Sequence, residues 1–130
     1  MKTKSLRQQA TIKAKPSEIY ELLMDSKKHG KFTGAPAKIE NKAGGKFSVH
    51  DGYIGGSNVK LIKNKKIVQM WRAKGWPDGH YSIATFNLKP VKGGTRIDFY
   101  QSGIPSDAHT SIKSGWISHY WIPMKKTLEK

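Results

Sequence analysis

The most regular hydrophobic pattern in the chain lies in its last quarter, over residues 107–130. Ile112, Trp116, Tyr120 and Met124 recur every four residues, with Ile117, Trp121 and Leu128 beside them. This spacing places the large apolar side chains on one face of a helix. A helix with two tryptophans and a tyrosine on one face predicts a large apolar surface elsewhere in the fold.

Three residues shape the expected course of this helix. Ser106 is the expected N-cap, because its side chain can accept a backbone N–H of the first turn. Gly115 has no side chain and suits the close approach of another backbone. Pro123 cannot donate to the carbonyl of His119, so a kink or a loosened turn is expected there.

The first third of the chain predicts one strand and two short helices. Residues 6–14 alternate between apolar and polar positions, which is typical of a half-buried strand. Pro16 fits the first position of a short helix, whose inner face is formed by Ile19, Leu22 and Leu23. Ser26 is the expected cap of a second short helix that runs to Phe32.

The middle of the chain predicts a series of short strands joined by turns. They cover residues 37–41, 46–50, 53–62 and 67–73, and a hairpin is formed by residues 81–88 and 95–102. Gly55-Gly56 predicts a bulge or tight bend, and Pro90 with Gly93-Gly94 closes the hairpin. Residues 67–73 are apolar on both faces, so the pattern does not fix which side of the sheet Trp71 faces.

This order of elements predicts an α+β fold. Two short helices after the first strand, successive hairpins and one long C-terminal helix favour an antiparallel sheet that curves around that helix. A chain of 130 residues is expected to form one domain, residues 1–130. A cavity is expected between the curved sheet and the helix, because neither surface is flat.

Charge narrows the classes of partner. The chain has 24 Lys+Arg against 9 Asp+Glu, a net charge of +15, but only three of the basic residues are arginines. The lysines are scattered, so the charge predicts a solvated basic surface, with an acidic protein partner as the next alternative and nucleic acid unlikely. The first residues are basic without a following apolar run, which predicts neither a signal peptide nor a membrane span. A cytoplasmic protein is expected.

The sequence predicts no catalytic site, metal or cofactor. There is no cysteine, which excludes disulfides and thiolate metal sites. No histidine stands at metal-pair spacing with an acid, and His109 and His119 are nearly three helical turns apart. No Gly-x-Ser-x-Gly nucleophile motif and no phosphate-binding glycine loop occurs. We therefore expect a non-enzymatic protein.

The aromatic residues are the candidate site. A small hydrophobic ligand between sheet and helix would contact Trp116 and Tyr120 from the helix, and Phe47, Trp71, Phe86 and Phe99 from the sheet. Trp76, Pro77 and His80 lie in the predicted loop 74–80. They are candidates for a lid or for a partner contact, and Trp76 fits a place in the core equally well.

An ordered set of motifs resembles a known family. They are Lys31-Phe-Thr-Gly-Ala-Pro-Ala37, Gly44-Gly-Lys-Phe47, Asp51-Gly-Tyr-Ile-Gly-Gly56, Ile67-Val-Gln-Met-Trp-Arg72, Trp76-Pro-Asp-Gly-His-Tyr81, Gly103-Ile-Pro105, and Gly115-Trp116 with Tyr120-Trp121. From about Ala10 to the end, the chain resembles the C-terminal-type domain of the activator of heat-shock protein 90 ATPase. This resemblance implies a START-like, helix-grip fold.

The resemblance also implies an alternative function for the chain. Eukaryotic activators carry an N-terminal domain with an Asn-rich motif and Trp-His-Trp, which this sequence lacks, so the chain resembles the stand-alone relatives. The leading prediction is a START-like module that binds a small hydrophobic molecule between sheet and helix. The alternative is a co-chaperone that docks on heat-shock protein 90 and modulates its ATPase. A third hypothesis is charge-driven nucleic-acid binding.

Overall fold

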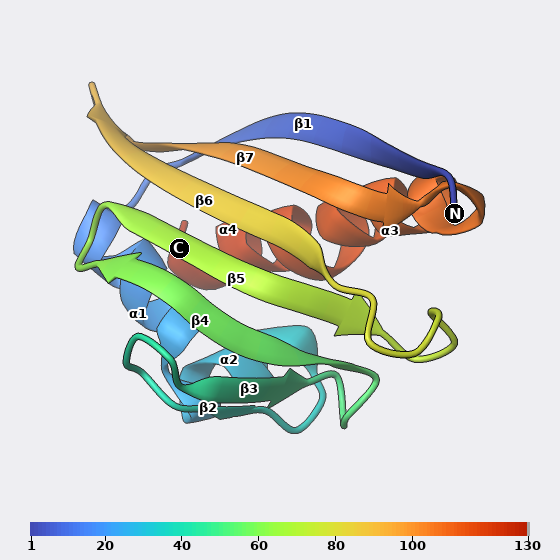
Figure 1. Ribbon diagram of the computed structural model, residues 1–130. Helices are drawn as coiled ribbons and strands as arrows, with labels where there is room; N and C mark the ends of the chain where they lie inside the picture. Colours follow the sequence, from blue (N-terminus) through green and yellow to red (C-terminus); the bar gives the residue numbers. More distant parts are fainter. Residues whose placement is uncertain (130) are drawn as a thin grey trace.

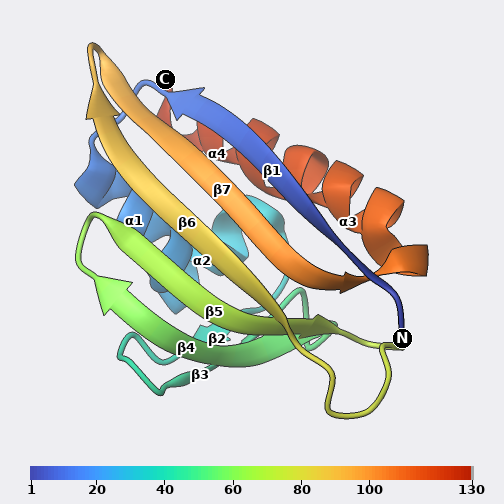
Figure 2. The same ribbon diagram turned by 45° about the horizontal axis from the view of Figure 1, so that its top comes forward.

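The computed structural model describes residues 1–129 and contains a seven-stranded antiparallel sheet with helices on its concave face (Figure 1). The order across the sheet is β1-β7-β6-β5-β4-β3-β2, most of which can be followed in Figure 2. The strands are β1 (Thr3–Ile12), β2 (Lys38–Ile39), β3 (Lys46–Val49), β4 (Ile54–Ile62), β5 (Lys66–Ala73), β6 (Ser82–Val91) and β7 (Gly94–Pro105). The predicted α+β, helix-grip class is confirmed.

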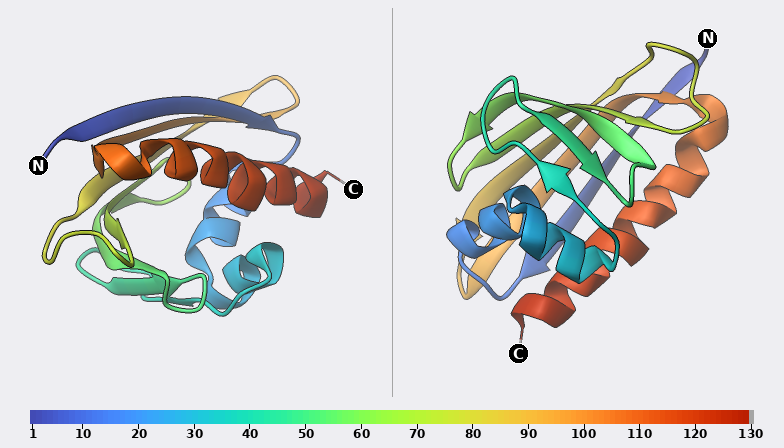
Figure 3. Two further views of the ribbon diagram at one scale, coloured as in Figure 1. Left: turned by 90° about the vertical axis from the view of Figure 1, so that its right-hand side faces the viewer. Right: turned by 90° about the horizontal axis from the view of Figure 1, so that it is seen from below.

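The helices occupy the concave side of the sheet. Helices α1 (Pro16–Met24) and α2 (Ser26–Thr33) follow β1 directly. The C-terminal helix is built from a 3₁₀ turn (Ser106–Ala108), α3 (His109–Trp116), a π-helical segment (Ile117–Trp121) and α4 (Ile122–Leu128). The left view of Figure 3 shows this helix between β1 on one side and the two short helices on the other.

Helix α2 begins differently from the prediction. Pro16 does occupy the first position of α1, as expected, but Asp25 rather than Ser26 caps α2. The carboxylate of Asp25 accepts the Lys28 backbone N–H at 2.8 Å. The Ser26 hydroxyl instead accepts the Ile39 backbone N–H at 2.8 Å, which ties α2 to the edge strand β2. Aspartate is as good an N-cap as serine, and here it stands one residue earlier.

The C-terminal helix departs from regular α-helical geometry at its start and just before Pro123, and only the second departure was expected. Ser106 opens the 3₁₀ turn and does not cap α3, which begins only at His109. The loosened turn expected at Pro123 lies just before it, where the Ile122 N–H bonds to the carbonyl of Ile117, five residues back. Such π-helical turns insert an extra residue and often occur at functional sites.

Strand pairing corrects two details of the sheet. The register shift in β4 lies between Asn58 and Lys60 and not at Gly55-Gly56. Gly56 is required for another reason, because a Cβ there would lie only 1.7 Å from the carbonyl oxygen of Met70. In the β6–β7 hairpin, Pro90 lies within the strand, so the turn itself consists of residues 92–93.

The core lies between the concave face and the helices. Phe86 pairs with Phe99 across β6 and β7, and both are buried, as the alternation predicts. Trp71 also faces inward and is 3% exposed, which settles the facing that the sequence left open. Ile117 is 43% exposed on the far side of the helix and so does not join the apolar stripe.

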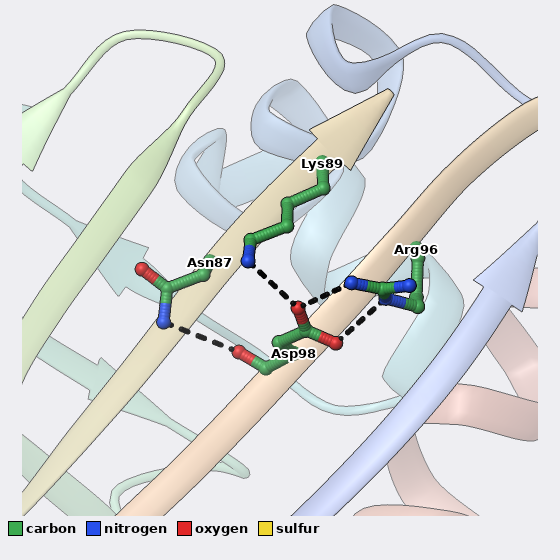
Figure 4. A network of polar contacts seen from close by, with 4 residues as sticks. All are labelled: Asn87, Lys89, Arg96 and Asp98. Carbon is green, nitrogen blue, oxygen red and sulfur yellow. Dashed lines mark hydrogen bonds and ion pairs between the residues drawn. The ribbon is translucent and has the colours of Figure 1, made fainter. Parts of the chain in front are cut away.

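The outer face of β6 and β7 carries a small ionic network (Figure 4). The Asp98 carboxylate accepts two hydrogen bonds from Arg96, at 2.9 and 3.1 Å, and lies 3.4 Å from the Lys89 amine. These contacts, above all the Arg96 hydrogen bond, hold the pKa of Asp98 below its usual value. Asp98 is therefore an ion-paired surface residue, consistent with its outward place in the strand.

Within residues 1–129, none of the helices is both long enough and apolar enough to cross a lipid bilayer.

Candidate functional site

The six aromatic residues predicted to contact a ligand come together inside the fold. They are Phe47, Trp71, Phe86, Phe99, Trp116 and Tyr120, and all six are buried. Ring centroids lie 4.4 Å apart for Phe99 and Trp116, 4.6 Å for Trp116 and Tyr120, and 5.6 Å for Trp71 and Trp116. Trp116 is thus the centre of the cluster, where helix and sheet meet.

A buried hydrogen-bond chain fixes the orientation of Trp116. Its indole nitrogen donates to Oε1 of Gln101 at 2.8 Å, and Nε2 of Gln101 donates to the Ser82 hydroxyl at 2.9 Å. The Ser82 hydroxyl in turn donates to the Trp71 carbonyl at 2.8 Å. Each link satisfies a polar group that would be costly to bury alone. The chain therefore holds the central tryptophan in one position.

Very little space remains between the packed rings themselves. A void of about 20 Å³ is lined by five of the six rings, those of Phe47, Trp71, Phe86, Trp116 and Tyr120. Such a volume has room for about one water molecule. A small molecule therefore needs other space.

That space is a neighbouring cleft of about 340 Å³ between the C-terminal helix and the β3–β4 turn. The turn and the sheet contribute His50, Tyr53, Ile54 and Trp71. The helix contributes Ser111, Ile112, Gly115, Trp116, His119 and Tyr120. None of these ten residues is acidic, and most are aromatic or aliphatic. We call this space the cleft.

Gly115 has a different role from the predicted one. No other backbone approaches it, since a Cβ there would meet only the His119 ring, at 3.8 Å. Instead, Gly115 lines the cleft and leaves it open.

Three imidazole rings follow one another from the cleft into the core. The centroids of His119 and His50 lie 5.9 Å apart, and those of His50 and His29 lie 6.3 Å apart. Nε2 of His29 shares a 3.0 Å hydrogen bond with the Tyr120 hydroxyl, while its Nδ1 is buried without a partner among the described residues. No three histidine or carboxylate groups within residues 1–129 are arranged to hold a metal ion.

Burial shifts the pKa of three of these side chains, His29, His50 and Tyr120. It lowers the pKa of His29 to about 4, with a smaller contribution from the nearby His50. Burial, and then the proximity of His119, also lowers the pKa of His50. Burial raises the pKa of the Tyr120 hydroxyl. His29 and Tyr120 are therefore neutral near pH 7.

The backbone beside His50 is unusual. His50, Asp51 and Gly52 have φ angles of 52°, 55° and 84°, three successive residues in the left-handed region. For residues with a Cβ this conformation is unfavourable and persists only when the surrounding structure enforces it. The Asp51 N–H bonds to the Pro36 carbonyl at 3.1 Å, which anchors the turn. The turn therefore holds His50 at the cleft.

The loop that contains Trp76, Pro77 and His80 does not cover the cleft. Trp76 is 8% exposed and its ring lies 5.6 Å from that of Trp71, so it belongs to the core. Pro77 is exposed, and its carbonyl accepts a hydrogen bond from Arg72 at 3.0 Å. His80 donates from Nε2 to the Gly103 carbonyl at 2.7 Å. None of the three residues lines the cleft.

A second concave feature lies on the outer face of the sheet, which we call the outer hollow. It extends from the β2 edge to β5, with a volume of about 1030 Å³. Its floor has little side-chain bulk, since Ser48, Gly55 and Ser57 form part of it. Three large side chains that line it are exposed, Tyr53 (52%), Met70 (36%) and Tyr81 (38%). The basic residues Lys38, Lys46, Arg72 and Lys74 line it together with one acid, Glu40.

Sequence reasoning missed His50, Tyr53, Ser111 and His119 as lining residues of the cleft. The histidines were set aside because their spacing does not suit a metal site. A weak signal was present for His119, which stands three residues after Trp116 and so shares its helical face. No comparable signal existed for His50, because only the fold brings the β3–β4 turn to the helix.

Comparison with known families finds a match over most of the chain. The family model for Activator of Hsp90 ATPase homolog 1-like protein matches residues 13–129. The human protein called activator of 90 kDa heat shock protein ATPase homolog 1 is 33% identical over 117 residues, which cover 90% of this chain and 35% of that protein. A Dictyostelium discoideum homologue is 34% identical over 118 residues, which cover 88% of this chain and 30% of that protein. The chain thus spans about a third of the length of these curated relatives.

Solved structures agree with this match. An HSP90 activator from Plasmodium falciparum superposes with a TM-score of 0.85 at 25% identity, covering 89% of each chain. The Aha1 dimer from Colwellia psychrerythraea gives a TM-score of 0.82 at 22% identity and shares the fold over 97% of this chain and 96% of that one.

Proposed function

Because the chain belongs to the Activator of Hsp90 ATPase homolog 1-like family, we propose that it is a non-enzymatic co-chaperone domain that docks on an Hsp90-type chaperone and modulates its ATPase. The observation that carries this proposal is the extent of the likeness. The family model covers residues 13–129, and the structure described as an HSP90 activator from P. falciparum superposes over 89% of each chain. A chaperone partner of this kind also fits the expected cytoplasmic location.

We place the docking surface at the outer hollow. Exposed tyrosine and methionine side chains beside an arginine are the composition typical of the centre of a protein interface. Met70 also lies opposite Ile83 in the β5–β6 pairing, and Ile83 is 38% exposed, so the apolar surface continues beyond the hollow. Four basic residues against one acid favour an acidic surface on the partner. The floor of the outer hollow, which has little side-chain bulk, leaves room for side chains of that partner.

The test is the ATPase rate of the Hsp90-type chaperone of the same organism, titrated with this protein. The parent is expected to change that rate in a saturable manner. Met70→Glu places an acid on the β5 side of the outer hollow, and we expect it to weaken the effect about tenfold or more. Val59→Glu is the matched control, because Val59 is 51% exposed on β4 and does not line the hollow. The proposal fails if the parent has no effect, or if both variants act alike.

A second function, small-molecule binding, is supported by the cleft. Its volume of about 340 Å³ is at the lower end of the range of ligand sites, and its walls are aromatic with a few converging polar groups. Trp71, Trp116 and Tyr120, three of the six predicted contact residues, line it. The proposed ligand position is therefore the cleft at the side of the aromatic cluster, between the helix and the β3–β4 turn. A thermal-shift screen of small aromatic molecules tests this role, and we expect at least one of them to raise the melting temperature.

A further inference from the structure

The polar groups of the cleft indicate what kind of molecule it takes. His50 from the β3–β4 turn and His119 from the π-helical segment both line it, with ring centroids 5.9 Å apart. The other titratable groups that face His50 are His29, at 6.3 Å, and Tyr120, at 5.5 Å between centroids. Tyr53 lines the same cleft. The polar groups at this place are thus imidazoles and phenols, and no residue that lines the cleft is a carboxylate.

This arrangement lacks a negative charge. The proximity of His119 disfavours the protonation of His50, whose pKa is lowered by burial and then by His119. An anion bound beside the two rings, accepting a hydrogen bond from an N–H group of each, would offset this repulsion. The net charge of +15 favours the approach of an anion as well.

Two irregularities of the backbone position these imidazoles independently. His50 stands in the turn whose three residues have positive φ angles. His119 stands in the π-helical segment, which displaces it from its place in a regular helix. Strained turns and π-helical insertions both concentrate at functional sites.

The walls supply the second part of the recognition. Trp116 and Tyr120 lie 4.6 Å apart between centroids and line one side, and Gly115 keeps the helix surface open beside them. Planar rings pack well against such side chains. A volume of about 340 Å³ accommodates a molecule of one or two rings.

We propose that the cleft binds a small aromatic carboxylic acid, whose carboxylate accepts hydrogen bonds from His50 and His119 and whose ring lies against Trp116 and Tyr120. The proposal rests on the small-molecule role given above and is independent of the docking of a chaperone at the outer hollow.

The experiment compares 2-naphthoate with its neutral isostere, 2-naphthamide. Binding is followed by tryptophan fluorescence, since Trp71 and Trp116 line the cleft, and by calorimetry. We expect the acid to bind the parent about tenfold or more tightly than the amide, a factor that corresponds to one charge-assisted hydrogen bond. His50→Gln and His119→Gln keep a hydrogen-bonding side chain but not the charge. Each should lower the affinity for the acid far more than the affinity for the amide, so that the preference for the acid is lost.

Two helix variants test the place of binding. Gly115→Leu fills the cleft and should abolish the binding of both compounds. Ser118→Leu adds the same side chain at an exposed position of the same helix, outside the cleft, and should leave binding as in the parent. Circular dichroism and thermal melts establish that each variant is folded.

The outcomes distinguish two claims, that the cleft binds a small molecule and that this molecule is an aromatic carboxylic acid. If acid and amide bind the parent equally, and Gly115→Leu abolishes both, the ligand class is wrong while small-molecule binding in the cleft stands. If neither compound binds at millimolar concentration, or if Gly115→Leu binds the acid as the parent does, both are overturned. A preference for the acid that the two histidine variants lose supports the proposal.

Discussion

The indole nitrogen of Trp116 donates a 2.8 Å hydrogen bond to Oε1 of Gln101 and so joins the C-terminal helix to the middle of the sheet. Both residues are fully buried, at 2% and 0% exposed. The bond lies at the point where the aromatic core, the cleft and the helix meet. Its strength and that of the packing around it decide how firmly the sheet holds the helix.

The first prediction concerns the loss of stability when the large Trp116 side chain is removed. It contacts the rings of Trp71, Phe86, Phe99 and Tyr120, so its removal leaves a large cavity in the core. Trp116→Ala should lower the free energy of unfolding by about 3–5 kcal/mol. Urea denaturation measures this change. A loss below about 1 kcal/mol would mean that the helix does not pack on the sheet through this face.

The Trp116–Gln101 hydrogen bond gives a second prediction by a double-mutant cycle. Gln101→Leu leaves the buried indole N–H without a partner, and should cost about 1–3 kcal/mol of unfolding free energy. In a Trp116→Phe background there is no N–H to leave unpaired, so the same substitution should cost clearly less. Equal costs in the two backgrounds would show that the bond contributes nothing specific.

Two glycines make a matched pair for the third prediction. Gly115→Ala should stabilise the protein by about 0.5–1 kcal/mol, because the helix gains a better helix former and the new Cβ meets only the His119 ring, at 3.8 Å. Gly56→Ala should destabilise it by about 1–3 kcal/mol or more, since that Cβ would overlap the Met70 carbonyl. Thermal melts of both variants check this, and effects of the same sign would contradict the geometry.

The fourth prediction concerns how the stability of the fold changes at acidic pH. The pKa of His29 is lowered from 6.5 to about 4 in the folded protein, so the unfolded chain binds the proton more readily. Stability is therefore complete above about pH 6.5 and falls as the pH decreases toward 4. This group accounts for a loss on the order of 3 kcal/mol across that interval. His29→Gln, which keeps a hydrogen-bonding group for the Tyr120 hydroxyl, should flatten this part of the pH profile measured by urea unfolding. If the variant has the same pH profile as the parent, His29 takes up its proton equally well in the folded and in the unfolded chain, which would contradict the lowered pKa.

Much of the architecture was predictable because it follows local periodicity. The four-residue repeat from Ile112 to Met124 located the helix, and the alternation around Phe86 and Phe99 located their inward faces. The errors lie where neighbouring residues of different types suit the same role, or where one residue type suits two different roles. Asp25 and Ser26 are both good N-caps and stand next to each other, and Gly55-Gly56 fits either a bulge or a close approach equally well. Only tertiary contacts decide between such alternatives.

The candidate sites were harder to predict. Periodicity identifies the aromatic residues of the helix, but the cleft depends on His50, whose turn reaches the helix only through the curvature of the sheet. The outer hollow has no sequence signature, because Met70 and Tyr81 come from different elements and become neighbours of Tyr53 only in the folded sheet. Pattern analysis treats each of these side chains as an ordinary surface residue.

The docking of a chaperone at the outer hollow is tested most directly by mapping the contact in solution. ¹⁵N-labelled protein is titrated with the unlabelled Hsp90-type chaperone, and the backbone amide signals are followed by NMR. The account predicts that signals of Ser57, Met70 and Arg72 around the hollow shift or broaden first, and that Met70→Glu suppresses the effect. Unchanged spectra at saturating chaperone, or changes confined to the C-terminal helix and β1, would contradict it.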